Sequence, residues 1–386
     1  MDIKEDAVHA ASHHHCKHRF FDDRNTTHSY NQNQNHINKT LPQQNTFRYL
    51  KMTTQYAAAH VSPKGPGDAR PKAREIVANE ELEGKWSDKT VLITGVSSGI
   101  GIETSRALFK TGATLYLTAR NLAKAKTALS DIVDSDRVHL IELDLNSLAS
   151  VRKCVETFLA QSKNLNLLIA NAGVMATPEG KTADGFETQW GTNHLAHFLL
   201  IQLLLPTLQE SAKKSPGFAS RVVVLTSSAH RDGPINWDDF NYERPGTYHP
   251  WAAYAQSKLA NLYTATEIER RYGGQGVHAW GVHPGLILTG LLVHIDEKTQ
   301  KEWSANPEVG NNIKDAEQGA ATTVWAATAK ALEGKGGKYL ENCGIAGPAP
   351  AKFEQHHAGH APNAYDEEAA KKLWEKTVEI LKPFSN

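Results

Sequence analysis

Short apolar runs alternate with longer segments of helical periodicity from about residue 88 onward. Residues 91–93 form an apolar run with β-branched side chains before a turn signal, which is typical of a parallel strand buried on both faces. Because strands that alternate with helices make right-handed crossovers, we expect one doubly wound parallel α/β sheet with helices on both faces. The pattern predicts further strands at 113–119, 137–142, 165–170, 221–227 and 277–282, and helices at 101–111, 121–134, 147–162, 185–210 and 251–273.

The segments at the two ends differ from this pattern. Residues 1–60 carry eight of the 19 histidines and little apolar periodicity, so we expect a disordered extension. Its His-rich stretch at 13–18 contains metal-ligand side chains, but we interpret it as a solvated tail and expect no metal site. Further elements are predicted as a Pro/Gly linker at 62–71, helices at 74–82, 316–329 and 367–381, and a last edge strand at 338–340.

Composition limits the partners and the compartment. The 386 residues carry 42 Lys+Arg and 42 Asp+Glu, so neither nucleic acid nor an anionic membrane is indicated as a partner. The three cysteines, at 16, 154 and 343, show no disulfide framework, which favours a reducing compartment, and we expect the cytoplasm. The apolar stretch at 195–208 is too short to span a bilayer, so no membrane anchor is expected. Met52 lies where the composition changes, which leaves open whether residues 1–51 are part of the mature protein.

A glycine turn follows the first strand in Thr94-Gly-Val-Ser-Ser-Gly-Ile-Gly101. Gly95, Gly99 and Gly101 let the chain turn sharply and let a pyrophosphate approach the main-chain N–H groups at the start of the next helix. The spacing differs from the commonest dinucleotide motif, and a glycine turn can also be a plain connection. We nevertheless interpret it as a nucleotide site.

Polar residues follow the next strands at the same edge of the predicted sheet, where ligands of such folds bind. Arg120 stands after the second strand, where an NAD-selective protein would place an acidic residue, so we expect NADP(H). Asp144-Leu145 after the third strand are placed to meet adenine, and Asn171-Ala-Gly173 after the fourth leave room for the cofactor. Each of these could also be ordinary turn chemistry.

A tyrosine and a lysine lie four residues apart in Tyr254-Ala-Gln-Ser-Lys258, which places them on one helical face. A neighbouring ammonium favours the phenolate, so Lys258 would draw the pKa of Tyr254 toward neutral pH. Tyr254 could then exchange a proton with a carbonyl oxygen or an alcohol. The spacing alone occurs often by chance, but Ser228 before it and the glycine turn upstream favour the catalytic interpretation.

In this order, the glycine turn, Asn171-Ala-Gly173, Ser228 and the Tyr254/Lys258 pair resemble the short-chain dehydrogenase/reductase family over about residues 85–345. The segments 190–200 and 257–261 are most similar to its retinol-dehydrogenase-like branch and fungal secondary-metabolism members. The resemblance implies a Rossmann-like domain at 85–345 with a substrate lid at about 286–314. It leaves residues 1–60 as the N-terminal extension, 61–84 as linker and short helix, and 346–386 as a C-terminal extension with a helix.

The resemblance also implies roles for individual residues. Ser228 would polarise the substrate carbonyl, Tyr254 would be the general acid or base, and Lys258 would lower the pKa of the tyrosine and hold the nicotinamide ribose. Asn193 would anchor a proton-relaying water. The turn from His283 to Thr289 resembles the family's nicotinamide turn, with Ile287 in place of valine. The implied cofactor-binding residues are Gly95, Ser98, Gly99, Ile100, Gly101, Arg120, Asp144, Leu145, Asn171, Gly173, Tyr254, Lys258, Ile287 and Thr289.

These features together predict an NADP(H)-dependent oxidoreductase that interconverts a ketone or aldehyde and an alcohol on a lipophilic small molecule, in secondary metabolism. We expect an aromatic substrate pocket formed by Trp237, Tyr248, Trp251 and Trp303. By resemblance, a homodimer or homotetramer would form through the helices at 185–210 and 251–273. Two alternatives stay open: a non-catalytic NADP-binding sensor or scaffold, and a nucleotide-sugar epimerase. The substrate, the direction and the stereochemistry are not given by the sequence.

Overall fold

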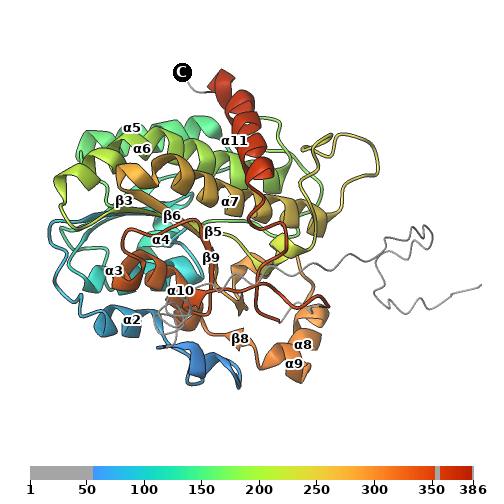
Figure 1. Cartoon of the computed structure of the whole chain (residues 1–386), viewed down its shortest axis with the longest axis horizontal. Helices are drawn as coiled ribbons and strands as arrows, with labels where there is room; N and C mark the ends of the chain where they lie inside the picture. The colour runs from blue at the N-terminus through green and yellow to red at the C-terminus, as the bar shows by residue number, and fades with distance from the viewer. Residues whose placement is uncertain (1–54, 353–356, 385–386) are drawn as a thin grey trace, which may run out of the picture. The chain divides into compact units, whose positions relative to one another are not determined.

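A computed structural model describes residues 55–352 and 357–384 (Figure 1). An eight-stranded sheet forms its centre in the order β10-β9-β6-β5-β4-β1-β2-β3, and every neighbouring pair is parallel except β9 and β10. The predicted doubly wound α/β sheet is therefore confirmed. The strands are β1 (Thr90–Thr94), β2 (Thr114–Ala119), β3 (Val138–Glu142), β4 (Leu167–Ala170), β5 (Ser220–Leu225), β6 (Val277–His283), β9 (Lys338–Glu341) and β10 (Gly344–Ile345).

Helices cover both faces of the sheet (Figure 1). Because side chains alternate along a strand, Leu92 packs into one apolar core while Val91 and Ile93 pack into the other. The first core lies under α5 (Leu148–Gln161), α6 (Ala196–Lys214), α7 (Pro250–Tyr272) and α11 (Glu367–Leu381). The second lies under α2 (Ala73–Asn79), α3 (Ile100–Lys110), α4 (Leu122–Ala128) and α10 (Ala316–Thr328).

Three predicted elements differ from the structure. The helix expected at 121–134 ends as α4 at Ala128, and Asp131 beyond it forms a salt bridge with Arg106 at 2.9 Å. The helix expected at 185–210 begins instead with a π-helical turn, η2 (Trp190–Leu195), which continues into α6. The strand at 338–340 was expected at the edge of the sheet, but β10 folds back antiparallel outside it.

Shorter elements complete the described chain. Two two-residue strands, β7 (Leu286–Ile287) and β8 (Ile313–Lys314), form a separate parallel pair. The chain between them contains η5 (Gly290–Leu292), α8 (Glu297–Ala305) and α9 (Pro307–Gly310). The remaining short helices are η1 (Ala57–His60), η3 (Ser228–Arg231), η4 (Gly273–Gln275), η6 (Lys330–Leu332) and η7 (Lys382–Phe384).

The C-terminal helix α11 packs across α6 and α7. The ring of Trp374 lies 4.7 Å from that of Phe198 and 6.3 Å from that of Tyr272, measured between centroids. Thr377 forms a 3.0 Å hydrogen bond with Nε2 of His194 in η2. An apolar helix face buried in this way belongs to the core rather than to the surface. The helix thus covers part of the surface of α6 and α7, the two helices through which subunit association was predicted.

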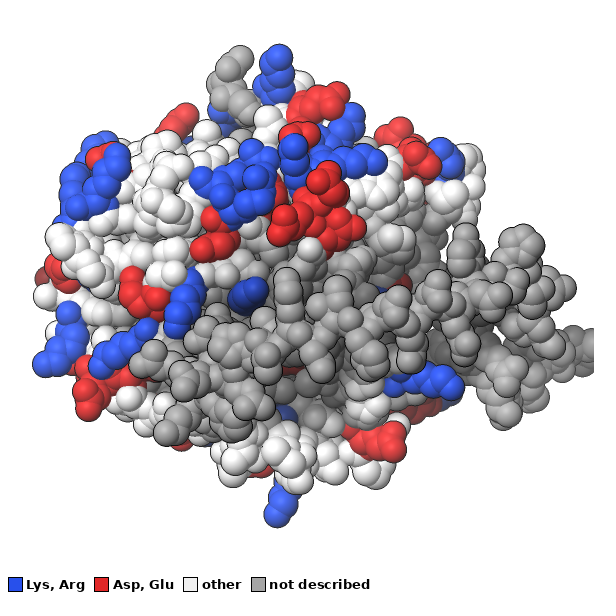
Figure 2. Space-filling view, viewed as in Figure 1, with Lys and Arg blue, Asp and Glu red and all other residues white. Residues whose placement is uncertain are grey.

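Charged side chains on the outside are mixed in sign. On the face shown in Figure 2, basic and acidic groups of the described residues alternate over short distances. The chain as a whole carries equal numbers of Lys+Arg and Asp+Glu. None of the helices within 55–352 and 357–384 has the length and apolar character needed to cross a bilayer.

Candidate active site

The order of the strands reverses between β1 and β4, so the chain leaves these two neighbours in opposite directions at their carboxyl ends. Thr94 at the end of β1 ties the two ends together. Its Oγ1 accepts hydrogen bonds from the main-chain amides of Asn171 (2.9 Å) and Ala172 (3.0 Å). In return, Nδ2 of Asn171 donates to the carbonyl oxygen of Thr94 at 2.8 Å. The glycine turn and the Asn171-Ala-Gly173 turn are therefore brought together, as expected.

The glycines of the first turn are required by close packing. A Cβ atom at Gly95 would lie 2.7 Å from Cβ of Ala172, and one at Gly101 would collide with the carbonyl oxygen of Gly95. Gly99, with φ +64°, adopts a conformation that L side chains rarely take. Helix α3 starts directly after it, so the free N–H groups and the positive end of the helix dipole face this edge of the sheet.

These residues fit a dinucleotide. The Oδ1 atom of Asn171 is buried and has no hydrogen-bond partner within the described chain, so it is available to a ligand. Ser98 in the glycine turn is exposed, and Arg120 at the end of β2 is exposed as well. The α3 N-terminus and Ser98 would hold the phosphates, and Arg120 would hold a group near the adenosine ribose.

Asp144 and Leu145 follow β3 but already have local roles. The Asp144 carboxylate accepts a hydrogen bond from the amide of Asn146 at 3.0 Å, and its own amide donates to Oγ of Ser150 at 2.9 Å. Leu145 is 8% exposed and belongs to the core on the α5 side. Both residues lie after β3 as predicted, and their contact with adenine stays a prediction.

Thr289 lies directly over the glycine turn. A Cβ atom at Gly99 would be 3.3 Å from Cβ of Thr289, and one at Gly290 would be 3.7 Å from Oγ of Ser98. Ile287, two residues earlier, lies near Gly319 of α10, where a Cβ would be 2.6 Å from its Cγ1. The structure thus brings Thr289 to the predicted cofactor site and shows the Ile287 side chain packed against α10.

Tyr254 and Lys258 lie one turn apart on α7, as their spacing predicts. The Lys258 Nζ is 5.5 Å from the centroid of the tyrosine ring and donates to the carbonyl oxygen of Leu225 at 3.2 Å. Burial lowers the pKa of Lys258 to about 8. Burial also raises the pKa of Tyr254 to about 12, and a hydrogen bond with the side chain of Ser227 opposes this only in part. Without ligands, the lowering of the tyrosine pKa expected from the sequence is absent.

The serine whose side chain bonds to the tyrosine is Ser227, whereas Ser228 was predicted for this place. The side chain of Ser227 bonds to that of Tyr254, and it also accepts from the amide of Ala229 at 3.2 Å as the N-cap of η3. Ser228 lies inside η3, and its main-chain amide donates to Nδ1 of His283 at 3.2 Å. The preference of serine for a helix N-cap was a sequence signal that favours Ser227.

The His230 ring is hydrogen-bonded to the serine turn and to the C-terminal segment. Its Nδ1 donates to the carbonyl oxygen of Ser227 at 2.6 Å, and its Nε2 accepts from the amide of Ala361 at 3.1 Å. Both bonds require a neutral ring with the proton on Nδ1. Burial lowers the pKa of His230 to about 4, which keeps it neutral at pH 7. The C-terminal segment is thereby linked to the serine turn.

Asn193 lies in the π-helical turn and points at the end of β4. Its Oδ1 accepts from the amide of Val174 at 2.8 Å, and its Nδ2 donates to the carbonyl oxygen of Val174 at 2.9 Å and to Oγ of Ser257 at 3.0 Å. A Cβ atom at Gly173 would lie 3.1 Å from Oδ1 of Asn193 and 3.4 Å from Nζ of Lys258. Gly173, Asn193 and Lys258 thus meet at one point.

The surroundings of Tyr254 are apolar. The tyrosine packs with Met175, Ala176, Ala229 and Leu292, and Trp303 lies partly buried against this cluster. The ring centroid of Trp251 lies 6.4 Å from those of Tyr254 and Trp303.

Of the other two predicted pocket aromatics, Trp237 packs against the core on the α6 and α7 side, whereas Tyr248 contacts the chain directly after Ala176 of this cluster. Trp237 lies beneath the ammonium group of Lys372 in α11, 4.1 Å from its ring centroid. Tyr248 donates its hydroxyl proton to the carbonyl oxygen of Thr177 at 2.8 Å. Both belong to the long connection between β5 and α7, whose path the sequence pattern does not determine.

Comparisons with known proteins identify the family. Residues 89–241 match the family model described as short chain dehydrogenase. The chain is 46% identical over 327 residues to the short-chain dehydrogenase/reductase prx1 of Penicillium roqueforti, covering 85% of this chain and 95% of that protein. The chain belongs to the short-chain dehydrogenase family. The predicted family membership is therefore confirmed.

Two further comparisons place this member of the short-chain dehydrogenase family more closely. Human retinol dehydrogenase 12 is 38% identical over 306 residues, which cover 78% of this chain and 88% of that protein. A solved structure from Mycobacterium paratuberculosis, of a protein itself uncharacterised, is 33% identical with a TM-score of 0.58, covering 78% of this chain and 97% of that one. The chain is thus an oxidoreductase of a family that uses NAD(H) or NADP(H), similar to fungal members and to retinol dehydrogenases.

Proposed function

We propose that this oxidoreductase uses NADP(H) to interconvert a ketone or aldehyde and an alcohol on a lipophilic small molecule. The observation that carries the proposal is the placement of the Ser227, Tyr254 and Lys258 side chains. They lie at the same edge of the sheet as the glycine turn, within one apolar environment. A tyrosine buried in this way has a proton to give and a neighbouring cation to stabilise the charge left behind.

The residues of this chain divide the chemistry as follows. Bound NADPH supplies a hydride to the carbonyl carbon. Tyr254 donates its phenolic proton to the carbonyl oxygen, while the Ser227 hydroxyl donates a hydrogen bond to the same atom. The Lys258 ammonium stabilises the phenolate, and Asn193 holds the Val174 main chain beside it. Since burial keeps Tyr254 protonated at neutral pH, the ligand-free site is set for reduction.

The preference for NADP(H) is supported by Arg120. It follows β2 directly, its side chain is exposed, and it makes no salt bridge to another of the described residues. A guanidinium at this place pairs with a ribose 2′-phosphate through two parallel hydrogen bonds, whereas a 2′-hydroxyl would favour a carboxylate. The neighbouring residues Ala119 and Asn121 offer no carboxylate.

The lipophilic substrate is supported in two ways, whereas the proposed role in secondary metabolism rests on the resemblance of residues 190–200 and 257–261 to fungal members. The groups around Tyr254 are apolar and include Trp251 and Trp303, which suit a hydrocarbon skeleton. Among its relatives are a protein named for retinol and the Penicillium protein prx1. We place the activity in a reducing compartment, because Cys154 and Cys343 are free and buried.

The competing proposal is a sensor or scaffold that binds NADP without turnover. The decisive experiment follows nicotinamide absorbance with NADPH and a panel of lipophilic ketones and aldehydes, for the wild type and Tyr254→Phe. We expect turnover by the wild type, at least a 100-fold loss in the variant, and equal NADPH binding by fluorescence in both. A wild type that binds NADPH and turns over no carbonyl compound, or a variant that keeps its rate, contradicts the proposal. Turnover of a nucleotide sugar would favour the epimerase alternative.

A further inference from the structure

The segment between β7 and β8 begins and ends at a very small sheet, which these two strands form with each other. Leu286 pairs with Ile313, and Ile287 pairs with Lys314, in parallel register. This pair is not joined to the eight-stranded sheet. Two strands of two residues each are not stable alone in water, so the hinge of this segment needs support from its sides.

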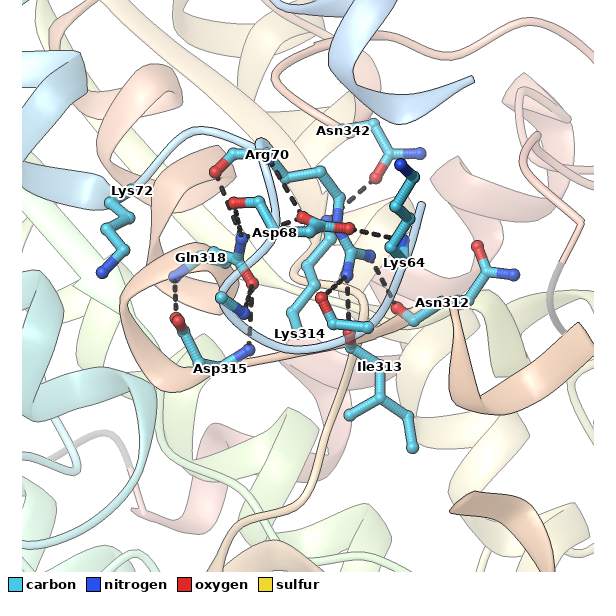
Figure 3. Close-up of polar contacts among 12 residues, drawn as sticks. Lys64, Asp68, Arg70, Lys72, Asn312, Ile313, Lys314, Asp315, Gln318 and Asn342 are labelled. Atoms are coloured by element: carbon cyan, nitrogen blue, oxygen red, sulfur yellow. Dashed lines mark hydrogen bonds and ion pairs between the residues drawn. The ribbon is translucent and has the colours of Figure 1, made fainter. Parts of the chain in front are cut away.

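Part of the support comes from Arg70, a residue more than 240 positions earlier in the chain (Figure 3). Its side chain is 2% exposed. Its Nη2 donates to the carbonyl oxygen of Ile313 at 2.6 Å and to that of Gly65 at 2.9 Å. Its Nη1 donates to the carbonyl oxygen of Asn312 at 2.9 Å, and its Nε donates to Asp68 at 2.8 Å. The planar fork of the guanidinium thus satisfies main-chain oxygens at the start of β8.

The segment that carries Arg70 is itself fixed to α10. We call residues 62–72 the N-terminal strap. Gln318, in the first turn of α10, accepts from the amide of Gly67 at 3.0 Å and donates to the carbonyl oxygens of Asp68 (3.1 Å) and Arg70 (3.2 Å). Figure 3 shows these groups converging between the strap and the start of α10. The linker expected at 62–71 is therefore a packed part of the domain.

The other side of β8 reaches the predicted cofactor turn. Nζ of Lys314, a buried residue, donates to Oδ1 of Asn342 at 2.9 Å and to the carbonyl oxygen of Pro284 at 3.4 Å. Gly285 has φ +101°, and a Cβ there would lie 2.9 Å from Cδ of Lys314. The position of β8 thus fixes β7 at both ends, and Thr289 lies two residues beyond β7.

We propose that the N-terminal strap anchors the hinge of the 286–314 segment, with Arg70 as a positioning residue for Thr289 at the cofactor site. Arg70 acts only through β8 and β7. Without it, the carbonyl oxygens of Asn312 and Ile313 lose their donor and the Asp68 carboxylate loses its cation, so the hinge loosens. The part that concerns the cofactor rests on the function proposed above, whereas the part that concerns the hinge does not.

The test uses the full chain with Arg70→Met, Arg70→Lys and the control Lys72→Met. Lys72 lies in the same strap but forms a salt bridge with Glu317 whose side chains are 38% and 31% exposed, and such a bridge contributes little. In hydrogen exchange without cofactor, we expect faster exchange at 286–289 and 313–314 in Arg70→Met, with an unchanged rate in β1 and β5. The lysine variant should recover only part of the protection, because it lacks the fork, and Lys72→Met should match the wild type.

In the second part of the test, NADPH binding and steady-state kinetics are measured for the same proteins. Arg70→Met should raise the Kd and KM for NADPH about tenfold while kcat changes little. Hinge exchange equal to the wild type in a folded Arg70→Met protein overturns the proposal, as does an equal rise throughout the sheet. If Arg70→Met does not fold, the test uses Asp68→Asn instead. This variant should show faster exchange at the same residues, with a smaller increase in rate. Faster hinge exchange in a protein whose wild type binds no NADPH supports the anchor and refutes only the proposed function.

Discussion

The side chain of Ser227 is hydrogen-bonded to that of Tyr254, whereas the adjacent Ser228 donates its main-chain amide to His283. The two serines are adjacent in sequence but occupy different positions at the start of η3. Ser227 is the N-cap residue, and Ser228 is the first residue of the helix. The cap residue, Ser227, is the one whose side chain bonds to the phenol. The hydroxyl that meets the developing charge on the substrate oxygen therefore belongs to Ser227 under the proposed mechanism.

Replacing each serine separately tests this assignment. Ser227→Ala should lower kcat for carbonyl reduction about 100-fold, because one preorganised donor is lost. Ser228→Ala should stay within about threefold of the wild type, since its contact to His283 uses the main chain. The measurement is initial rate against substrate concentration with saturating NADPH. A larger loss in Ser228→Ala would return the role to that residue.

The pKa of Lys258 predicts how the rate depends on pH. Reduction needs Tyr254 protonated, which holds up to about pH 12, and Lys258 charged, which holds only below about pH 8. We therefore expect kcat/KM for reduction to be flat from pH 6 to 7.5 and to fall tenfold per pH unit well above pH 8. The protein is incubated at each pH and assayed again at pH 7 to exclude inactivation. A rate that rises between pH 8 and 9.5 would show that Lys258 has no such role.

Arg120 should decide between the two nicotinamide cofactors. In Arg120→Asp, the NADPH Kd should rise at least tenfold and the NADH Kd should fall, because the carboxylate repels a 2′-phosphate and accepts from a 2′-hydroxyl. Lys124→Asp, an equal charge change at an exposed site one turn into α4, is the matched control and should change the ratio little. Fluorescence titration measures both constants. A wild type that prefers NADH would contradict the cofactor proposal.

Buried histidines predict a loss of stability in acid. Burial lowers the pKa of His194 to about 3 and those of His197 and His230 to about 4, against 6.5 in the unfolded chain. Below pH 6.5 the unfolded state binds protons that the folded state does not, so the free energy of unfolding falls as the pH drops toward 4.

Each of these histidines contributes a slope of up to about 1.4 kcal/mol per pH unit. His194→Gln should remove one such contribution, at some cost in stability at pH 7 because its bond to Thr377 changes. Urea unfolding between pH 4.5 and 7 measures the slopes. Parallel curves for the variant and the wild type would show that His194 takes up a proton in the folded state.

The fold was predictable because its signals are local and repeated. The apolar run at 91–93 and the glycines at 95, 99 and 101 each determine a short piece of main chain, and the alternation of strands and helices limits their assembly to few topologies. The four-residue spacing of Tyr254 and Lys258 belongs to the same class, since a helix puts them on one face whatever surrounds them.

The missed features depend on contacts distant in sequence or on loop paths. Arg70 is part of a Pro/Gly-rich stretch that has the composition of a linker, and its partners Asn312 and Ile313 lie far along the chain. Trp237 was grouped with the pocket by type and proximity in sequence, but it packs under Lys372 of α11 instead. The periodicity of apolar residues does not predict the path of a loop or its distant contacts.

The π-helical turn at Trp190–Leu195 amounts to one extra residue inserted into a helix that otherwise continues as α6. Shortening this turn by a single amino acid would let the ladder revert to regular winding and swing the Asn193 amide by roughly 100° away from Val174. The length of the chain at this point therefore determines where the Asn193 side chain lies as much as the identity of the residue does. In a homologue with one residue fewer between Gln189 and Ala196, the asparagine side chain would no longer reach the main chain of Val174, even if every other side chain were the same.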